Sequence, residues 1–482
     1  MLFNSIDFAI FLPVVFLIYW FATGKSIKVQ NFFIVVASYT FYGWWDWRFL
    51  SLILLSTCTD YFVGVKLKGE IIEGKRKALL WTSVVINLGT LGIFKYYNFF
   101  IENLTNAFSF FGAEINPTSL NVVLPVGISF YTFQTLSYTI DVYRKKLKPT
   151  HDFIAFAAFV GFFPQLVAGP IERAKNLLPQ FQQKRSFDYS KATDGLRQIL
   201  WGLFKKVVIA DNCAFLANQI FNDSVEMNGS TLVLGAIFFA FQIYGDFSGY
   251  SDIAIGTARL FGFNLMKNFS FPYFSRDIAE FWRRWHISLS TWFRDYLYIP
   301  LGGNHKKSII TFRNVLVVFL VSAFWHGANW TFIAWGTFHA LLFLPLILTR
   351  NHRKNLDIAA KGKVLPTLKE LLQITLTFVL TTLAWIFFRS ENMNQALDVF
   401  STIFSSSLFE LPSFSEMYQS YPIILITIAF VIMEWQGREQ EFAIQKFGFQ
   451  WSMTFRHSFY YLLIFMIMWF GGREQEFIYF QF

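Results

Sequence analysis

Apolar stretches that approach 20 residues in length recur from one end of this chain to the other. Clear examples occupy residues 8–22, 78–94 and 371–388, and the last is LLQITLTFVLTTLAWIFF. About 20 helical residues cross the hydrocarbon core of a bilayer. Backbone polar groups have no water to bond there, so a lipid-facing sheet edge is excluded. Only 15% of the residues are charged, against about 25% in soluble domains. We therefore predict an all-α polytopic membrane protein with roughly 11 transmembrane helices plus re-entrant and interfacial amphipathic helices.

Basic loops indicate how the spans are oriented. Short loops rich in Lys and Arg stay on the cytoplasmic side of a membrane, and such loops lie at 66–77, 143–152 and 350–363. Counting back through three spans from the first loop predicts an N-terminus outside. The first apolar segment lacks a basic leader, so it is expected to be a retained span. No long linker appears, and residues 1–482 are predicted to form a single integral-membrane domain.

Composition and motifs exclude several classes of function. The net charge of +10 comes from loop residues, so membrane lipids with anionic headgroups explain it without nucleic acid. Two cysteines, Cys58 and Cys213, build neither a disulfide framework nor a cysteine metal site. The sequence contains no H-E-x-x-H zinc motif and no G-x-S-x-G nucleophile motif. We expect no metal centre and no bound cofactor.

One segment, 276–300, is too charged for an ordinary lipid-facing span. An apolar stripe recurs along it at steps of three and four, which predicts an amphipathic helix; its members are Trp282, Trp285, Leu289, Trp292 and Tyr296. If that helix is unbroken, Arg276, Arg283 and Arg294 form one line on the polar side, with His286 at its border. The arginines either snorkel to lipid phosphates or guide a phosphate-bearing donor. Both interpretations remain open from the residues alone.

A histidine ends an apolar run within AFWHGANW, residues 323–330. Burial at membrane depth keeps an imidazole neutral, so His326 is a candidate general base for a hydroxyl that attacks a thioester. Asn329 and the backbone after Gly327 are candidate oxyanion donors, and Trp325 is a candidate substrate or donor contact. A helix-capping role for His326 competes with the catalytic one.

Four other polar residues in apolar surroundings are expected to be structural. Asp246 and Asp252 lie among small residues, where a carboxylate needs a partner. His339 and His457 interrupt or begin apolar segments and are expected to be packed and hydrogen-bonded.

Long motifs resemble those of the membrane-bound O-acyltransferase family, in its bacterial alginate O-acetyltransferase branch. The strongest are FWRRWHISLSTWFRDYLYIPLGGN (281–304) and FWHGANWTFIAWGTFHA (324–340). Supporting stretches are LPVGISFYTFQTLSYTIDVYR (124–144), FFPQLVAGPIER (162–173) and GDFSGYSDIAIG (245–256). The resemblance extends over essentially the whole chain.

This resemblance implies a multi-pass enzyme of the bacterial inner membrane, with a ring of helices around a tunnel. His326 matches the family's catalytic histidine, and His286 matches the second histidine, nearer the cytoplasmic mouth. An acetyl group is expected to pass from a cytoplasmic thioester, such as acetyl-CoA, to a hydroxyl acceptor across the membrane. In the polysaccharide branch, a periplasmic SGNH-like partner then modifies an exported polymer such as alginate.

Two alternatives to this function remain open. A related activity would transfer D-alanine to teichoic acid from a carrier protein. A transporter or lipid flippase would also carry polar residues inside the membrane, although no matching halves with paired helix breaks are found.

Overall fold

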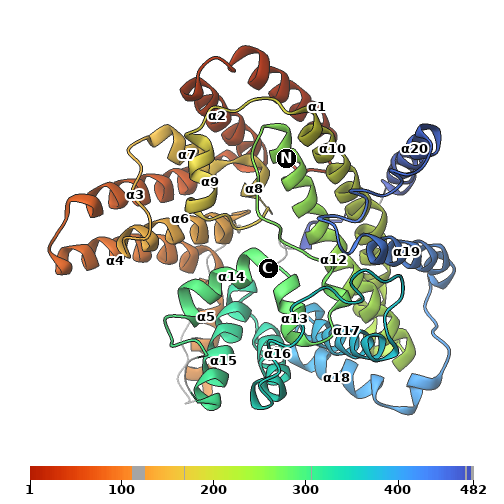
Figure 1. Cartoon of the computed structure of the whole chain (residues 1–482). Helices are drawn as coiled ribbons and strands as arrows, with labels where there is room; N and C mark the ends of the chain where they lie inside the picture. Colours follow the sequence, from red (N-terminus) through yellow and green to blue (C-terminus); the bar gives the residue numbers. More distant parts are fainter. Residues whose placement is uncertain (111–124, 168, 305–306, 473–474, 479–482) are drawn as a thin grey trace. The chain divides into compact units, whose positions relative to one another are not determined.

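A computed structural model describes residues 1–110, 125–167, 169–304, 307–472 and 475–478. These residues form helices joined by loops, and no strand occurs among them. The fold is therefore all-helical, as predicted (Figure 1). The helices are α1 (Ile6–Leu17), α2 (Ile27–Asp46), α3 (Leu50–Gly69), α4 (Glu73–Leu91), α5 (Tyr97–Phe110), α6 (Ile128–Tyr143), α7 (Phe153–Gly161), α8 (Phe163–Leu166), α9 (Ala174–Phe181), α10 (Tyr189–Leu203), α11 (Asp211–Asn222), α12 (Gly229–Leu260), α13 (Ile278–Arg284), α14 (Ile287–Phe293), α15 (Ser308–His326), α16 (Trp330–Leu348), α17 (Leu368–Arg389), α18 (Met393–Ile403), α19 (Met417–Gly437) and α20 (Met453–Phe470).

Seven helical stretches of the described chain are long and apolar enough to cross a membrane. Two of them, 27–69 and 73–110, each contain two α-helices. The other five stretches coincide with α12, α15, α16, α17 and α19. A shorter apolar helix covers 6–22. The polytopic class is confirmed, and length and composition support seven spans where about 11 were expected.

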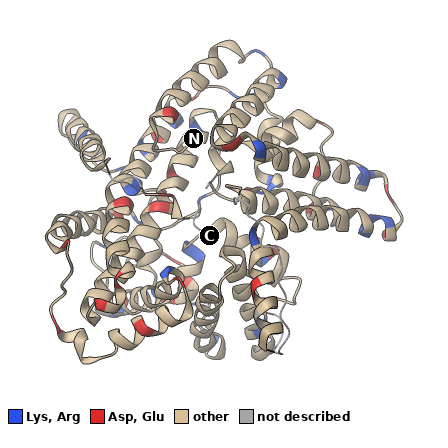
Figure 2. Ribbon diagram, turned by 180° about the vertical axis from the view of Figure 1, so that it is seen from behind, with Lys and Arg blue, Asp and Glu red and all other residues tan. Residues whose placement is uncertain are grey.

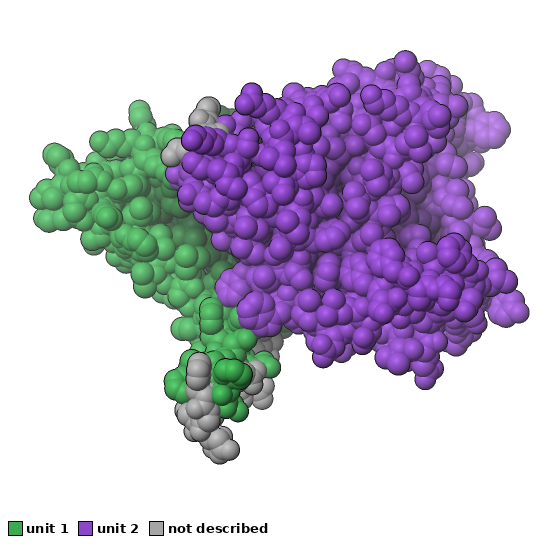
Figure 3. Space-filling view, turned by 90° about the horizontal axis from the view of Figure 1, so that it is seen from below, with its two compact units in different colours: residues 1–195, 257–266 green, residues 196–256, 267–482 purple. Residues whose placement is uncertain are grey.

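The chain divides into two compact units (Figure 3). Unit 1 comprises residues 1–195 and 257–266, and unit 2 comprises 196–256 and 267–482. Two boundaries fall within α10 and α12, and the third, between residues 266 and 267, lies in the loop after α12. A single integral domain over 1–482 stays a prediction.

In unit 1, a buried carboxylate holds three helices together. Asp60 on α3 is fully buried, and it accepts hydrogen bonds from Asn87 on α4 (2.7 Å) and Thr139 on α6 (2.6 Å). Ser83 on α4 donates a further bond to it. Polar groups inside a membrane bundle need such partners. The network therefore fixes the contact among α3, α4 and α6.

The basic loop at 66–77 lies where α3 meets α4, and Figure 2 shows Lys and Arg gathered at that tip. Arg76 is an exception among them because it is buried. Its guanidinium donates to the carbonyl oxygens of Leu67 and Tyr143, each at 2.7 Å. One cation of the loop thus ties α4 to α3 and to the end of α6.

Glu172 gives unit 1 a pH-dependent stability. Its side chain is 1% exposed, and burial raises its pKa from about 4.5 to about 7. Because the pKa of this carboxyl is higher in the folded than in the unfolded chain, its contribution to stability is fully present at pH values below the unfolded pKa. This contribution is lost as the pH rises through the folded pKa of about 7. At about 1.4 kcal/mol per pKa unit, roughly 3 kcal/mol is lost between pH 4.5 and pH 7. We expect Glu172→Gln to melt at a higher temperature than the wild type at pH 8 and at a similar one at pH 4.5. Equal melting temperatures at both pH values would contradict this assignment.

In unit 2, two buried lysines neutralise carboxylates. Lys206 is 1% exposed, and its Nζ lies 2.8 Å from both Asp211 and Asp246. The Nζ of Lys205 lies 2.5 Å from Asp252. Both aspartates of the 245–256 motif are thus held by ion pairs, in agreement with their expected structural role.

The two histidines expected to be packed differ in the structure. His339 on α16 is fully buried, and its Nδ1 accepts a hydrogen bond from Trp282 at 3.3 Å. His457 on α20 is exposed. The expectation was confirmed for His339 and wrong for His457, because the start of α20 leaves that side chain uncovered.

Candidate active site

The expected helix over 276–300 is broken, which corrects the arginine line drawn from the sequence. α13 ends at Arg284 and α14 begins at Ile287. Between them, His286 takes a left-handed backbone conformation with φ 42°. A residue other than glycine adopts this conformation at a cost of roughly 1–2 kcal/mol, so neighbouring contacts must hold it. Arg276 precedes α13, and Arg294 lies beyond α14 in a π-helical turn.

The three arginines therefore have separate environments. Arg276 lies 3.0 Å from Glu280 and 2.8 Å from Asp357. Arg283 donates to the backbone carbonyl oxygens of residues 352 and 355, at 3.0 and 2.6 Å. Arg294 is largely exposed and pairs with Asp295 at 2.9 Å. Arg276 and Arg283 hold the 352–357 segment, and the expected line of arginines is not formed.

His326 is the last residue of α15 and is 4% exposed. Its Nδ1 lies 2.7 Å from the carbonyl oxygen of Ser322, one turn earlier. A carbonyl oxygen only accepts, so Nδ1 carries the proton and Nε2 carries the lone pair. Aromatic rings surround the imidazole, with centroids 5.1 Å away for Trp335 and 5.6 Å for Phe388. The contact at Nδ1 leaves Nε2 as the ring nitrogen that can accept a proton.

The break after His326 requires glycine. Gly327 is extended, and a Cβ there would lie 2.1 Å from the ring of Phe332. Its N–H donates to the carbonyl oxygen of Ala323 at 3.2 Å. The close approach of Phe332 explains why a glycine follows the histidine.

Asn329 has a capping role instead of the expected oxyanion role. Its Oδ1 accepts from the Thr331 N–H at 3.0 Å at the start of α16. Its Nδ2 donates to the carbonyl oxygen of Glu391 at 2.8 Å. Both the oxygen and the nitrogen of the amide are therefore hydrogen-bonded. Asparagine is a preferred residue at the N-cap of a helix.

His286 is 1% exposed and lies outside the long apolar helices. Burial holds the pKa of its imidazole well below the usual range, and the nearby His326 lowers it further. Its ring packs edge-on against Phe247, with centroids 4.6 Å apart. His286 is therefore a neutral imidazole at neutral pH.

Trp325 lies between the two histidines. Its ring centroid is 4.9 Å from that of His326 and 6.1 Å from that of His286. The structure thus brings together three of the seven sequence-predicted site residues. The side chains of the other four bond other partners.

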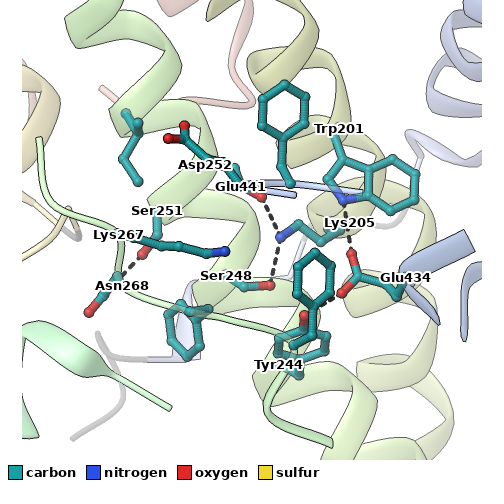
Figure 4. A pocket seen from close by; sticks show the side chains of 14 residues that line it. Trp201, Lys205, Tyr244, Ser248, Ser251, Asp252, Lys267, Asn268, Glu434 and Glu441 are labelled. Atoms are coloured by element: carbon teal, nitrogen blue, oxygen red, sulfur yellow. Dashed lines mark hydrogen bonds and ion pairs between the residues drawn. The ribbon is translucent and has the colours of Figure 1, made fainter. Parts of the chain in front are cut away.

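A small polar pocket is lined in part by Asn268 (Figure 4), whose Oδ1 lies near Nδ1 of His286. Ser251 and Asn268 line one part of it, and Trp201, Lys205 and Glu434 line another. Lys267 also lines the pocket, and burial lowers its pKa to about 8. Glu434 accepts hydrogen bonds from Trp201 at 3.0 Å and Tyr244 at 2.5 Å.

The sequence did not indicate Asn268 as part of the site. It is fully buried, and its Oδ1 lies 3.2 Å from Nδ1 of His286. A lone asparagine 18 residues before the histidine carries no recognisable spacing signal. Only the fold brings the two side chains together.

The geometry suits proton transfer between neutral groups. Two buried imidazoles and a polar pocket lie together in unit 2, and no group of three metal-binding side chains occurs in the part of the chain that the structure describes. A base of this kind takes a proton from a hydroxyl near neutral pH.

Comparison with known proteins assigns the family. A profile of the membrane-bound O-acyltransferase family matches residues 78–369. The chain is 40% identical over 445 residues to the probable alginate O-acetylase AlgI of Pseudomonas aeruginosa, covering 91% of this chain and 82% of that protein. It is 37% identical over 428 residues to the peptidoglycan O-acetyltransferase of Helicobacter pylori, covering 83% and 79%. A teichoic acid D-alanyltransferase of Streptococcus thermophilus is 32% identical over 237 residues, covering 45% and 55%. The chain belongs to the membrane-bound O-acyltransferase family.

Proposed function

We propose that this protein is a bacterial inner-membrane enzyme that transfers an acetyl group from a cytoplasmic thioester to a hydroxyl destined for an exported polysaccharide. The observation that carries the proposal is the pair of buried histidines, His326 and His286, each in ring contact with Trp325. The relatives named for alginate and peptidoglycan O-acetylation cover most of the chain and favour a polysaccharide acceptor.

In the proposed reaction, His326 is the general base. Its Nε2 takes the proton of the acceptor hydroxyl while the hydroxyl oxygen forms a bond to the thioester carbonyl carbon. The carbon–sulfur bond then breaks, and the sulfur leaves with the electron pair. The proton held by His326 passes to the thiolate, so the enzyme returns to its starting state. The bond from Nδ1 to the Ser322 carbonyl oxygen holds the ring in the tautomer that this step needs.

The donor is proposed to be acetyl-CoA, approaching from the cytoplasmic side past His286. Arg294 is the arginine of the predicted set that is largely exposed, so we assign a donor phosphate to it. The cytoplasmic loops at 66–77 and 350–363 and an outside N-terminus define the proposed orientation. A periplasmic SGNH-like acetyltransferase is the proposed partner that completes the modification.

We expect Arg276→Gln and Arg294→Gln to affect different properties. Arg276 is buried against Glu280, so its loss should lower the free energy of unfolding by about 3 kcal/mol. Arg294→Gln should change stability by less than about 0.5 kcal/mol. Loss of one charged phosphate contact should raise the donor KM about tenfold while kcat is kept. An unchanged donor KM in Arg294→Gln would remove the donor role of Arg294.

Vesicles that contain the purified wild-type protein test the reaction class. With ¹⁴C-acetyl-CoA, the proposed SGNH-like partner and a polysaccharide acceptor, we expect free CoA thiol and labelled acetyl ester to appear in equal amounts. A transporter would move intact solute without releasing thiol. A D-alanyltransferase would label the acceptor only from a D-alanyl carrier protein. Either of these last two results would overturn the proposed function.

A further inference from the structure

Asn268 forms several hydrogen-bond contacts with His286 and with the two residues that follow it. Its Oδ1 accepts from the Ser288 N–H at 3.2 Å and from the Ser288 hydroxyl at 2.8 Å. The same oxygen lies 3.2 Å from Nδ1 of His286. Its backbone carbonyl oxygen accepts from the Ile287 N–H at 2.8 Å. One asparagine thus contacts all three residues at the left-handed turn.

These contacts also fix the orientation of the amide. A backbone N–H only donates, so the atom of Asn268 that faces the Ser288 N–H is the oxygen. The Nδ2 on the other side donates to Ser251 at 3.1 Å, which fits this orientation. The amide oxygen only accepts, so Nδ1 of His286 must carry a proton to bond it. The lone pair of the neutral ring therefore lies on Nε2.

His326 also carries its proton on Nδ1, but a different kind of hydrogen bond holds it there. Its Nδ1 bonds a backbone carbonyl oxygen of its own helix, which no side-chain substitution removes. The tautomer of His286 depends instead on side chains. Asn268 is 0% exposed and accepts from Nδ1, and the Ser288 hydroxyl, 3.4 Å from the same Nδ1, donates its proton to Asn268 Oδ1 at 2.8 Å. The second histidine is therefore the one whose proton can be moved by mutation.

We propose that Asn268 is a positioning residue that holds His286 with its proton on Nδ1, so that Nε2 accepts a hydrogen bond during acyl transfer. The catalytic consequence rests on the proposed function, whereas the tautomer itself does not. Asn268 does not need to touch either substrate for this role. It acts through the ring of His286 and through the turn that carries that ring.

The test uses Asn268→Leu, which keeps the approximate size of the side chain and removes the acceptor. Full-length protein with ¹⁵N-labelled histidine is reconstituted in lipid vesicles, and the His286 signals are identified by their loss in His286→Gln. We expect the wild-type ring to show a protonated Nδ1 and an unprotonated Nε2, and Asn268→Leu to populate the opposite tautomer. Its kcat should fall about 10- to 100-fold, while the donor KM should change less than threefold.

Asn314→Leu is the matched control, because Asn314 is also 0% exposed and its amide donates to the carbonyl oxygens of Leu301 and Gly303. It should lower the melting temperature without changing the His286 signals. An unchanged His286 tautomer in Asn268→Leu would overturn the proposal. A changed tautomer with wild-type kcat would also overturn it, because the positioning role would then have no consequence.

Asn268→Asp keeps the proposal testable if Asn268→Leu does not fold. The aspartate retains an acceptor for Nδ1, so we expect the Nδ1 proton to stay and the added negative charge to raise the pH at which His286 titrates. Among the described residues, the ionisable groups that face His286 or the pocket beside Asn268 are His326, Lys205, Tyr244, Lys267, Asp252, Glu434 and Glu441. If His286 titrated at the same pH in Asn268→Asp as in the wild type, Asn268 would not contact the His286 ring and the proposal would be wrong. Failure of the proposed function would appear separately, as acetyl transfer that survives in His326→Ala.

Discussion

Replacing His326 by alanine should lower kcat for acetyl transfer about 100- to 10,000-fold per folded molecule, the usual contribution of a general base. The physical reason is that the ring is buried at the end of α15 with Nδ1 bonded to a carbonyl oxygen, which leaves Nε2 as the base. No other group of the described site can take the same position. The measurement is the rate of thiol release by purified protein, divided by the amount that elutes as a monodisperse peak.

His339→Gln is the matched control for that substitution. His339 is also a buried histidine, and the ring of Trp335 contacts it as well as His326, with centroid distances of 5.2 and 5.1 Å. Its Nδ1 accepts from Trp282, so its tautomer is the reverse of that of His326. We expect a lower melting temperature and a kcat within about threefold of the wild type. Equal losses of kcat in both variants would mean that His326→Ala acts through packing.

Replacing Lys206 by methionine should give the largest loss of stability. Lys206 lies 2.8 Å from both Asp211 and Asp246 and donates to the carbonyl oxygen of Gln475 at 3.0 Å. Its removal leaves two buried carboxylates without their cation, which costs about 3–5 kcal/mol. That is a large part of the 5–15 kcal/mol that typically separates folded from unfolded protein. Detergent-solubilised Lys206→Met should therefore melt at a much lower temperature or fail to accumulate.

Removing the charges of both aspartates together with that of Lys206 should restore the stability that Lys206→Met loses. The triple variant Lys206→Met, Asp211→Asn, Asp246→Asn contains no uncompensated charge at this position, so we expect it to regain most of the lost melting temperature. Lys205→Met should cost less, because Asp252 also accepts a hydrogen bond from Gln198 at 2.7 Å. A wild-type melting temperature in Lys206→Met would contradict the structural role of this ion-pair cluster.

The fold class and the end of a helix at His326 could be predicted because both depend on local pattern. Apolar length and low charge indicate membrane helices, and the glycine after His326 marks the end of a span. The predicted line of arginines was wrong because the helix that was to carry it is broken at one residue. His286 adopts a left-handed conformation, and no residue-spacing rule predicts that of a histidine. The loss of helical phase there separates Arg276 and Arg283 from Arg294.

Sequence patterns could not predict the contacts between residues that are far apart in the chain. Asn268 meets His286 only because the 263–271 segment returns beside the turn between α13 and α14. Asn329 looked like an oxyanion donor because a polar amide follows the histidine motif, yet the start of α16 uses it as a cap. The preference of asparagine for N-cap positions is the sequence signal for this role.

The acetate content of the exported polysaccharide tests the central claim most directly. Cells that lack the native gene would express either the wild-type protein or His326→Ala, at equal amounts in the membrane fraction. Base-released acetate per sugar residue is then measured on the purified polymer. The account predicts acetylated polymer with the wild type and no acetate above the gene-deleted background with His326→Ala. Wild-type acetate content in the His326→Ala cells would contradict it.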